Sequence, residues 1–332
     1  MSDGKPVGYA VVGCGRISQA HLKAARTLPD DLDVVAVVDM IEEKAKERAA
    51  EFDVPTVYTK LDDALADDRI QIIDACTQPV FHAPIAVQSA NAGKHVVVEK
   101  PLCVTVKEAD EMIAAGKANN VKVMSGQSRR FNDLVFEAKK IIESGDIGEL
   151  LHVNIATGNR TEGPPIAWWG DEEFTGPNAL IANWASHWID QFVYLAGKKP
   201  LRVMAEAADH HDKYAGDDEW SMLVRFEDNL IATYTHSFNC KMGIAGGFEY
   251  AGSKGTVEIR GNAVYLEGKK IEGVGDNTNN FAAMLKELVD SIREDRDVLC
   301  NAEQVRDVIA IGEAAMISAR EHRCVELSEL SG

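Results

Sequence analysis

Buried apolar segments alternate with helical segments through the first 126 residues, and this alternation constrains the possible folds more than any other feature of the sequence. Strands that alternate with helices of about 10 to 15 residues indicate βαβ units, whose strands form one parallel sheet. The sequence therefore predicts a parallel sheet covered by helices. The predicted strands are 7–12, 33–38, 56–58, 70–75, 96–99 and 121–126, and the predicted helices are 19–28, 42–52, 61–66, 82–92 and 106–119.

From Leu150 onward the pattern changes to single apolar and polar residues in alternation, with short turns between the segments. This texture indicates an antiparallel sheet that has one buried face. A chain of 332 residues also suits two domains, which we place at residues 1–126 and 127–332. In the second part the predicted strands are 151–156, 201–208, 220–226, 230–238, 247–252, 255–260 and 263–268, and the predicted helices are 133–144, 277–293 and 302–320.

The composition argues against several classes of partner. The formal net charge is −18, whereas binding to nucleic acid or to an anionic membrane needs clustered Lys and Arg. No apolar run reaches the roughly 18 residues of a membrane span, and the N-terminus lacks the layout of a signal peptide. The 6 cysteines are scattered without a C-x-x-C pair, so we expect no metal site, no disulfide framework and a cytoplasmic protein.

A glycine turn, Gly13-Cys14-Gly15-Arg16-Ile17-Ser18, follows the first strand and opens the first helix. Gly13 permits a tight turn, and Gly15 lets the backbone approach a pyrophosphate at the helix N-terminus. Ser18 stands where close packing of helix on strand favours a small residue. Glycine turns also serve simple packing, but the strand and helix on either side favour a dinucleotide site.

Asp39 ends the second strand, roughly 20 residues beyond the glycine turn. A carboxylate there can accept hydrogen bonds from an adenosine ribose and would repel a 2′-phosphate, which favours NAD over NADP. No arginine follows Asp39 directly to bind such a phosphate. The alternative, an N-cap for the helix 42–52, is compatible with this role.

Polar residues also follow the fourth and fifth strands. Thr77 and Gln78 come just past strand 70–75, where they would flank a bound dinucleotide or form an ordinary turn. Lys100 ends strand 96–99 and is followed by Pro101, which cannot donate to a ladder and therefore stops the strand. Ligands bind beyond the carboxyl ends of parallel strands, so Lys100 is either a functional lysine or a surface lysine at a strand end.

A polar stripe is predicted in the second half, because Asn183, His187 and Asp190 fall on one face if their segment is helical. A lone histidine there would be a satisfied core residue, whereas Asn and Asp beside it favour a face that binds substrate. The nearby pair Trp168 and Trp169 suits the apolar face of a sugar ring, since C–H groups pack on aromatic faces. A subunit contact is the alternative for the tryptophans.

Four of these motifs, in their spacing, resemble one family. They are Gly13-Cys14-Gly15-Arg16-Ile17, then Asp39, then Cys76-Thr77 with His82 beyond it, and Gly93-Lys94-His95-Val96 running into Glu99-Lys100-Pro101-Leu102. The resemblance is to the glucose-fructose oxidoreductase, inositol dehydrogenase and rhizopine-catabolism (Gfo/Idh/MocA) family. It implies an N-terminal Rossmann-type domain that binds the cofactor, a C-terminal α/β domain with a large, mainly antiparallel open-faced sheet, and a homo-oligomer, dimer or tetramer.

The resemblance also implies roles for individual residues. Lys100 reaches nicotinamide and substrate, the bond before Pro101 is often cis, and Arg129 faces the substrate while Arg130 is structural. His187 takes the place of the catalytic histidine, but Asn183 replaces the family's first acid and cannot take a proton. The residues expected at the cofactor are Gly13, Gly15, Arg16, Ile17, Asp39, Thr77, Gln78, His82, Glu99 and Lys100; those expected at the substrate are Arg129, Trp168, Trp169, Asn183 and His187, with Lys100, His187 and Asn183 the catalytic set.

These observations predict an NAD-dependent dehydrogenase that acts on a hydroxyl carbon of a sugar, cyclitol or related polyol. Either His187 or Lys100 would serve as the base; we assign His187 as the base and Lys100 as its hydrogen-bonding and charge partner. One alternative is an enzyme that holds NAD and cleaves glycosides through transient oxidation. Another is a dinucleotide-binding sensor without activity, which Asn183 favours and which Lys100 and His187 argue against.

Overall fold

The computed structural model describes residues 5–158, 160–161, 163–164, 166–176, 180–210, 213–240, 247–275 and 279–330. Contacts divide the chain into two compact units, each with its own sheet. The first comprises Met1–Cys103, Glu108–Ser128 and Asn279–Val305; the second comprises Val104–Lys107, Arg129–Thr278 and Arg306–Gly332. A single boundary after residue 126 therefore describes only part of the division, because residues 279–305 return to the first unit. The functions assigned to residues 1–126 and 127–332 stay predictions.

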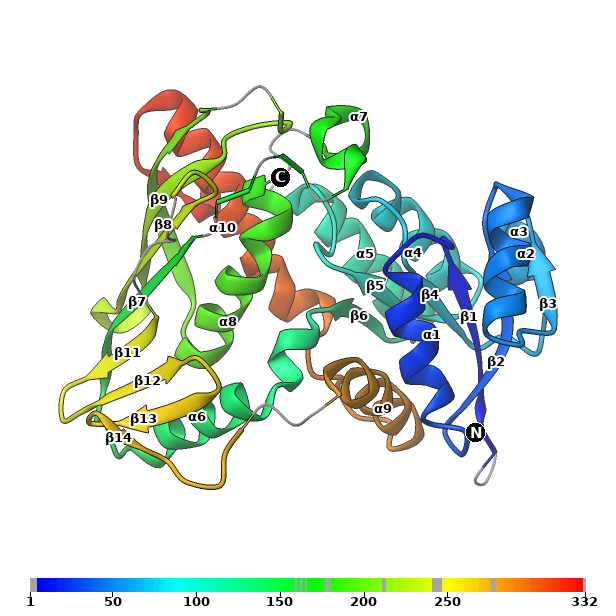
Figure 1. Ribbon diagram of the computed structural model, residues 1–332, viewed down its shortest axis with the longest axis horizontal. Coiled ribbons are helices and arrows are strands. Elements are labelled where there is room, and N and C mark those ends of the chain that lie inside the picture. Colours follow the sequence, from blue (N-terminus) through cyan, green and yellow to red (C-terminus); the bar gives the residue numbers. More distant parts are fainter. Residues whose placement is uncertain are drawn as a thin grey trace. The chain divides into compact units, whose positions relative to one another are not determined.

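The first unit holds a 6-stranded parallel sheet in the order β3-β2-β1-β4-β5-β6, as predicted (Figure 1). The strand order reverses between β1 and β4, and ligands of such sheets bind beyond the carboxyl ends at this switch point. Every residue of β1, β4, β5 and β6 is buried, as in sheets covered on both faces. The strands are β1 Val7–Val12, β2 Leu32–Val38, β3 Thr56–Tyr58, β4 Ile72–Ala75, β5 His95–Glu99 and β6 Val123–Gly126.

Helices of the first unit follow the predicted segments closely. The late helix α9 (Asn280–Arg293) packs against α1 (Ser18–Arg26), and its Arg293 pairs with Asp31. These contacts explain why residues 279–305 belong to this unit. The remaining helical segments are α2 Glu42–Glu51, α3 Leu61–Leu65, η1 Pro79–Phe81, α4 His82–Asn91 and α5 Val106–Asn119, and η2 Ser128–Phe131 continues from Ser128 into the second unit.

The second unit holds a 9-stranded sheet in the order β14-β13-β12-β11-β7-β10-β9-β8-β15. Only the pair β7 and β10 is parallel among the described strands, so the predicted mainly antiparallel sheet is confirmed. The two edge strands, β14 and β15, were not predicted, because a strand of two residues is too short to show an alternation of apolar and polar residues. The strands are β7 Leu150–Gly158, β8 Pro200–Ala208, β9 Glu219–Phe226, β10 Ile231–Ser237, β11 Phe248–Gly252, β12 Thr256–Arg260, β13 Ala263–Leu266, β14 Lys269–Lys270 and β15 Val325–Glu326.

Two helices pack on one face of this sheet, with α6 against β12 and β13 and α8 against β7 (Figure 1). Asn132 caps α6 by accepting the N–H of Leu134, and Gly145 ends it in the left-handed region. No helix of the described residues has the length and apolar character needed to cross a membrane. The helical segments are α6 Asp133–Ser144, η3 Ala167–Gly170, α7 Glu172–Thr175, η4 Leu180–Trp184, α8 Ser186–Ala196, η5 Glu227–Asn229, α10 Ala302–Glu321 and η6 Leu327–Leu330.

Candidate functional site

The glycine turn leaves room for a dinucleotide backbone. Gly13 has a φ of +94°, and a Cβ there would lie 2.7 Å from the carbonyl oxygen of Cys76, so only glycine fits. At Gly15 the position of a Cβ has no heavy atom of the described residues within 4 Å. The space over Gly15 is therefore open, as a backbone that approaches a pyrophosphate requires.

Helix α1 begins directly after this turn. The Ser18 hydroxyl donates to the carbonyl oxygen of Gly15 at 2.6 Å and so stabilises the turn. Among the described residues, no side chain caps the helix N-terminus and its first turn carries no acid. In the same turn, Arg16 is exposed and Ile17 is half-buried. The N-terminus of α1 thus fits an anionic group, since its first N–H groups have no partner within the helix.

Asp39 is fixed beside the glycine turn by two backbone hydrogen bonds. Its Oδ2 accepts the N–H of Cys14 at 2.9 Å, and its Oδ1 accepts the N–H of Ile41 at 2.9 Å. Ile41 precedes α2 as its N-cap residue, and no side chain caps that helix among the described residues. The alternative of a capping role for Asp39 therefore finds no support in the hydrogen bonds. The oriented carboxylate is suited to a ribose.

Arg48 clamps the same turn from α2 and was missed by the sequence analysis. Its guanidinium donates to the carbonyl oxygens of Cys14 and Gly15, at 3.2 Å each, and pairs with Glu51. A residue more than thirty positions beyond the turn carries no sequence signal for this contact. Arg48 is thus held by these three groups beside the turn.

His82 joins the loops that follow β4 and β5. The ring is buried, with Nδ1 2.7 Å from the carbonyl oxygen of Pro101 and Nε2 3.1 Å from that of Thr77. Burial lowers the pKa of His82, so the neutral ring donates its single N–H to one of the two carbonyls. Both ring nitrogens thus face backbone, and a contact of His82 or Gln78 with a cofactor stays a prediction.

Lys100 follows β5 at the carboxyl edge of the sheet and is half-buried. The bond between Lys100 and Pro101 is cis, as the resemblance implied. The preceding residue, Glu99, is only 5% exposed, and its Oε2 accepts the backbone N–H of Lys100 at 2.9 Å. The carboxylate of Glu99 therefore holds the backbone of Lys100 in place at the end of the strand.

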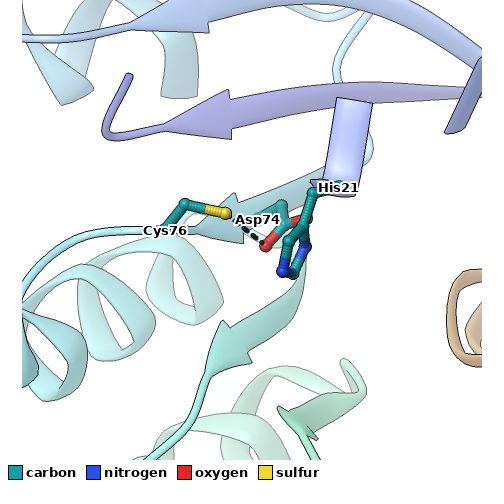
Figure 2. Close-up of side chains that lie close together, drawn as sticks. All are labelled: His21, Asp74 and Cys76. Carbon is teal, nitrogen blue, oxygen red and sulfur yellow. Dashed lines mark hydrogen bonds and ion pairs between the residues drawn. The ribbon is translucent and has the colours of Figure 1, made fainter. Parts of the chain in front are cut away.

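A buried polar cluster lies behind this strand end, and the sequence analysis did not find it. Figure 2 shows His21 from α1 beside Asp74 of β4 and Cys76, which follows that strand. His21 Nδ1 lies 2.6 Å from Asp74 Oδ2, and His21 Nε2 lies 2.9 Å from Glu99 Oε1. Burial by itself lowers the pKa of His21, but Asp74 raises it well above the ordinary value, so the ring is held as an imidazolium.

Three members of this cluster, His21, Asp74 and Cys76, are of metal-ligating type, with ligand atoms within 4.8 Å of one another. Ligands of one ion lie about 3 Å apart or more, because each must stand about 2 Å from the metal. The separation of 2.6 Å between His21 Nδ1 and Asp74 Oδ2 is instead that of a hydrogen bond. Burial also raises the pKa of the Cys76 thiol, which keeps it protonated. The geometry is that of a hydrogen-bonded cluster.

The predicted helical stripe of the second unit is interrupted. Asn183 is 2% exposed and lies in the π-helical turn η4, whereas His187 lies in α8, which begins at Ser186. The Ser186 hydroxyl donates to the Asn183 carbonyl at 2.8 Å and joins the two segments. Asn183 and His187 therefore do not share one continuous α-helix; π-helical turns of this kind are frequent at functional sites.

Asp190 does not belong to a face that binds substrate, which corrects the interpretation from the sequence. It is 1% exposed and pairs with Arg130, whose Nη2 lies 2.7 Å from Oδ1 and whose Nε lies 2.9 Å from Oδ2. Burial raises the pKa of Asp190 and the Arg130 guanidinium opposes this. Both carboxylate oxygens thus hold Arg130. The neighbouring Arg129 is exposed and stacks over Trp188, with Cζ 4.2 Å from the ring centroid.

Aromatic rings collect around Trp184, which the sequence analysis passed over. Trp169 is buried and packs edge-on against Trp184 at 6.0 Å, and Trp168 packs against Trp169 at 6.1 Å. His236 of β10 lies 6.0 Å from Trp184 and stacks on Trp220 at 4.7 Å. The paired tryptophans are therefore part of a larger cluster, which we call the aromatic cluster: Trp168, Trp169, Trp184, Trp220, His236 and Phe238.

Four buried nitrogens of the aromatic cluster have no hydrogen-bond partner among the described residues. They are the indole nitrogens of Trp169, Trp184 and Trp220, and Nε2 of His236. His236 Nδ1 lies 2.7 Å from the Thr157 hydroxyl, and burial lowers the pKa of His236 to about 4, so the ring is neutral. Buried polar atoms in proteins are nearly always hydrogen-bonded. The cluster thus combines apolar ring faces with buried nitrogens that lack a partner among the described residues.

Comparisons with known proteins agree with these two units. Residues 7–127 match the oxidoreductase family with an NAD-binding Rossmann fold, and residues 135–258 match the GFO/IDH/MocA C-terminal domain. The chain belongs to the Gfo/Idh/MocA family. It is an NAD-binding oxidoreductase of that family, and the family resemblance found in the sequence is confirmed.

Individual relatives of this Gfo/Idh/MocA chain are distant and differ in their reactions. A myo-inositol 2-dehydrogenase of Thermotoga maritima is 24% identical over 341 residues, covering 97% of this chain and 99% of the relative. A 4-carboxy-2-hydroxymuconate-6-semialdehyde dehydrogenase of a Sphingobium species is 26% identical over 308 residues, covering 90% and 94%. The structure of a levoglucosan dehydrogenase with NADH and L-sorbose has a TM-score of 0.88 at 22% identity, covering 97% and 99%, and shows likeness of fold.

Proposed function

We propose that this Gfo/Idh/MocA protein is an NAD-dependent dehydrogenase for a hydroxyl carbon of a sugar, cyclitol or related polyol. One observation carries the proposal. Gly15, Asp39 and Lys100 follow the carboxyl ends of β1, β2 and β5, which are strands of one parallel sheet. An open phosphate turn, an oriented ribose acceptor and an ionisable lysine therefore lie along one edge of that sheet, beside its switch point.

The roles of the side chains follow from their chemistry. A bound nicotinamide supplies the hydride chemistry, and the protein orients the carbinol and moves its hydroxyl proton. We assign that proton to His187, because histidine is the side chain whose ordinary pKa lies nearest neutrality. Lys100 donates a hydrogen bond to the reacting oxygen, and its positive charge stabilises negative charge on that oxygen. Asn183 can position a hydroxyl but cannot take its proton.

The aromatic cluster supports a polyhydroxylated substrate. Indole rings pack on the C–H face of a sugar or cyclitol, and buried donors such as Trp184 Nε1 and Trp169 Nε1 fit its hydroxyls. Two of the relatives described above carry names of inositol and levoglucosan dehydrogenases. The carboxylate of Asp39 supports NAD over NADP, because it would repel a 2′-phosphate.

A second copy of the chain is the proposed macromolecular partner. Met204 of β8 and Leu223 of β9 are exposed although apolar, and they are register partners on adjacent strands. Exposed apolar side chains that pair across a sheet are typical of an interface. We expect a dimer or tetramer, which light scattering after gel filtration measures directly. A monomer at micromolar concentration would contradict this.

A ligand screen tests the proposed activity. The protein with NAD⁺ is melted in the presence of single sugars and polyols, myo-inositol among them, because a ligand of the folded state raises its apparent stability. Hits are then assayed for NADH formation. We expect turnover with at least one polyol and its loss in Lys100→Ala. Stabilisation by NAD⁺ without turnover of any polyol would contradict a dehydrogenase; product without net NADH would indicate transient oxidation.

A further inference from the structure

Glu99 uses both of its carboxylate oxygens inside the first unit. Oε2 accepts the backbone N–H of Lys100 and Oε1 faces His21 Nε2, each at 2.9 Å. The adjacent strand makes room for this side chain, because a Cβ at Gly126 would lie 3.0 Å from the Cα of Glu99 and 3.4 Å from its Oε1. Glycine at position 126 is thus part of how the carboxylate is seated.

His21 connects Glu99 to a second buried acid. Asp74 lies in β4 among apolar residues and faces His21 Nδ1 at 2.6 Å, as Figure 2 shows. The Tyr9 hydroxyl donates to the same oxygen of Asp74, and the Cys76 thiol lies 3.4 Å from the other. The hydrogen bonds run from β4 through α1 to the end of β5. They end at the backbone of Lys100.

Stability is a weak explanation of this arrangement. Two carboxylates of the sheet and the imidazolium of α1 lose their hydration on burial, and replacing such groups by apolar residues is often neutral or stabilising. The arrangement therefore calls for a second reason. What the ion pairs do supply is a fixed geometry, since His21 can meet both acids in only one orientation.

We propose that His21, Asp74 and Glu99 form a positioning network for Lys100. None of them touches the substrate; they hold the backbone from which the lysine side chain leaves the strand. His21 also lies on α1, whose N-terminus is expected to hold the pyrophosphate, so the network fixes the lysine relative to the cofactor site of the same unit. The inference rests on the proposed function, in which Lys100 meets the reacting oxygen.

Two variants of Glu99 separate positioning from folding. Glu99→Ala removes the acceptor for the Lys100 N–H, whereas Glu99→Gln keeps an acceptor oxygen. We expect Glu99→Ala to lower kcat about a hundredfold, the scale of a reacting group displaced by about 1 Å. Glu99→Gln should retain kcat within about tenfold, the scale of one hydrogen bond. The Kd for NADH, measured by fluorescence titration, should change far less than kcat in both.

A readout that needs no substrate accompanies the kinetics. Hydrogen–deuterium exchange at the Lys100 amide reports the hydrogen bond to Glu99 directly. We expect protection of this amide to be lost in Glu99→Ala and kept in Glu99→Gln. His21→Asn, which cuts the network one step further back, should reduce both the protection and kcat by an intermediate amount.

His95→Asn is the matched control. His95 lies at the other end of β5, is equally buried, and accepts the N–H of Lys122 at 3.0 Å. It should lower Tm without a change in kcat or in Lys100 protection. If Glu99→Ala and His21→Asn behave as His95→Asn does while Lys100→Ala abolishes turnover, positioning is overturned and the proposed function stands. If Lys100→Ala keeps turnover, the proposed function fails first. Should Glu99→Ala not fold, His21→Asn decides.

Discussion

Two clusters of buried polar groups, one in each unit, differ in one respect: the network of His21, Asp74 and Glu99 has a partner at every polar atom, which we call saturated, and the aromatic cluster does not. In the first unit, Asp74 and Glu99 share His21, and every described oxygen of these acids has a donor. In the second, Trp184 Nε1 and His236 Nε2 are buried and have no partner among the described residues. Both clusters contain buried polar atoms, but only the network around His21 pairs all of them.

This difference separates two uses of buried polarity. A buried network in which every polar atom already has a partner gives rigidity. Unpaired buried donors raise the free energy of the protein without ligand. A ligand that supplies the missing acceptors removes this cost, and binding becomes more favourable. Variants in the saturated network should therefore change catalysis, and variants in the aromatic cluster should change affinity for the polyol.

The largest effects are expected where each unit supplies a reacting group. Lys100→Ala and His187→Ala should each lower kcat by at least about a hundredfold, the scale of losing a positioned acid or base, while NADH binding is retained. The double variant should be little worse than the poorer single variant, because both groups act in one transition state. Lys94→Ala is the control, since its Nζ donates to the carbonyl oxygens of Asp67 and Ile70. A His187→Ala enzyme near full activity would contradict the assignment.

Cofactor choice should respond to the first unit alone. Asp39→Ala removes a ribose acceptor and a charge that repels a 2′-phosphate, so the preference for NAD over NADP in kcat/KM should narrow by about tenfold. The KM for the polyol should change little, since Asp39 lies beside the glycine turn. Equal use of NADP by the unmodified protein would disprove the cofactor assignment.

Substrate affinity should respond to the aromatic cluster. Trp184→Phe keeps an aromatic ring and deletes one buried N–H, so the KM for the polyol should rise about fivefold, the scale of one hydrogen bond, with the Kd for NADH unchanged. Tyr250→Phe is the control, because it deletes a buried hydroxyl that accepts from Gln191 at 3.1 Å outside the cluster. An unchanged KM would mean that ring faces satisfy the indole N–H groups.

Sequence reasoning found the first sheet because its signals are local. Each signal involves only a few neighbouring residues: the strand and helix periods, the glycine turn, and the proline after Lys100. It missed the partners of those elements: Arg48 on the glycine turn and Phe281 against His21, with ring centroids 4.9 Å apart, come from distant segments. A sequence period does not say which helix returns to which sheet.

In the second unit, sequence reasoning placed the polar residues but not their use. Asn183, His187 and Asp190 were read as one stripe because an ideal helix puts them on one face. The π-helical turn places Asn183 off the face that an ideal α-helix would give it. Asp190 forms a salt bridge with Arg130. His236 and Trp220 carry no motif at all; they meet because β9 and β10 pair in register. Only the tertiary structure contains that information.

Two buried histidines, His236 in the second unit and His21 in the first, should change the pH dependence of stability in opposite directions. Burial lowers the pKa of His236 to about 4, from an ordinary value of 6.5. Between these values the unfolded chain binds a proton that the folded chain refuses, so the stability falls as the pH drops from 6.5 toward 4, by no more than about 3 kcal/mol for this residue.

The pKa of His21 is shifted the other way, because Asp74 outweighs the effect of burial. Its stabilising contribution is fully present below pH 6.5 and is lost as the pH rises through the higher pKa of the folded state. Urea unfolding followed across this range should therefore show an acidic decline that His236→Gln reduces and an alkaline decline that His21→Asn reduces. If His21→Asn leaves the alkaline limb unchanged, the ring is not held as an imidazolium between the two acids, and the saturated network of the first unit is no longer an ionic one.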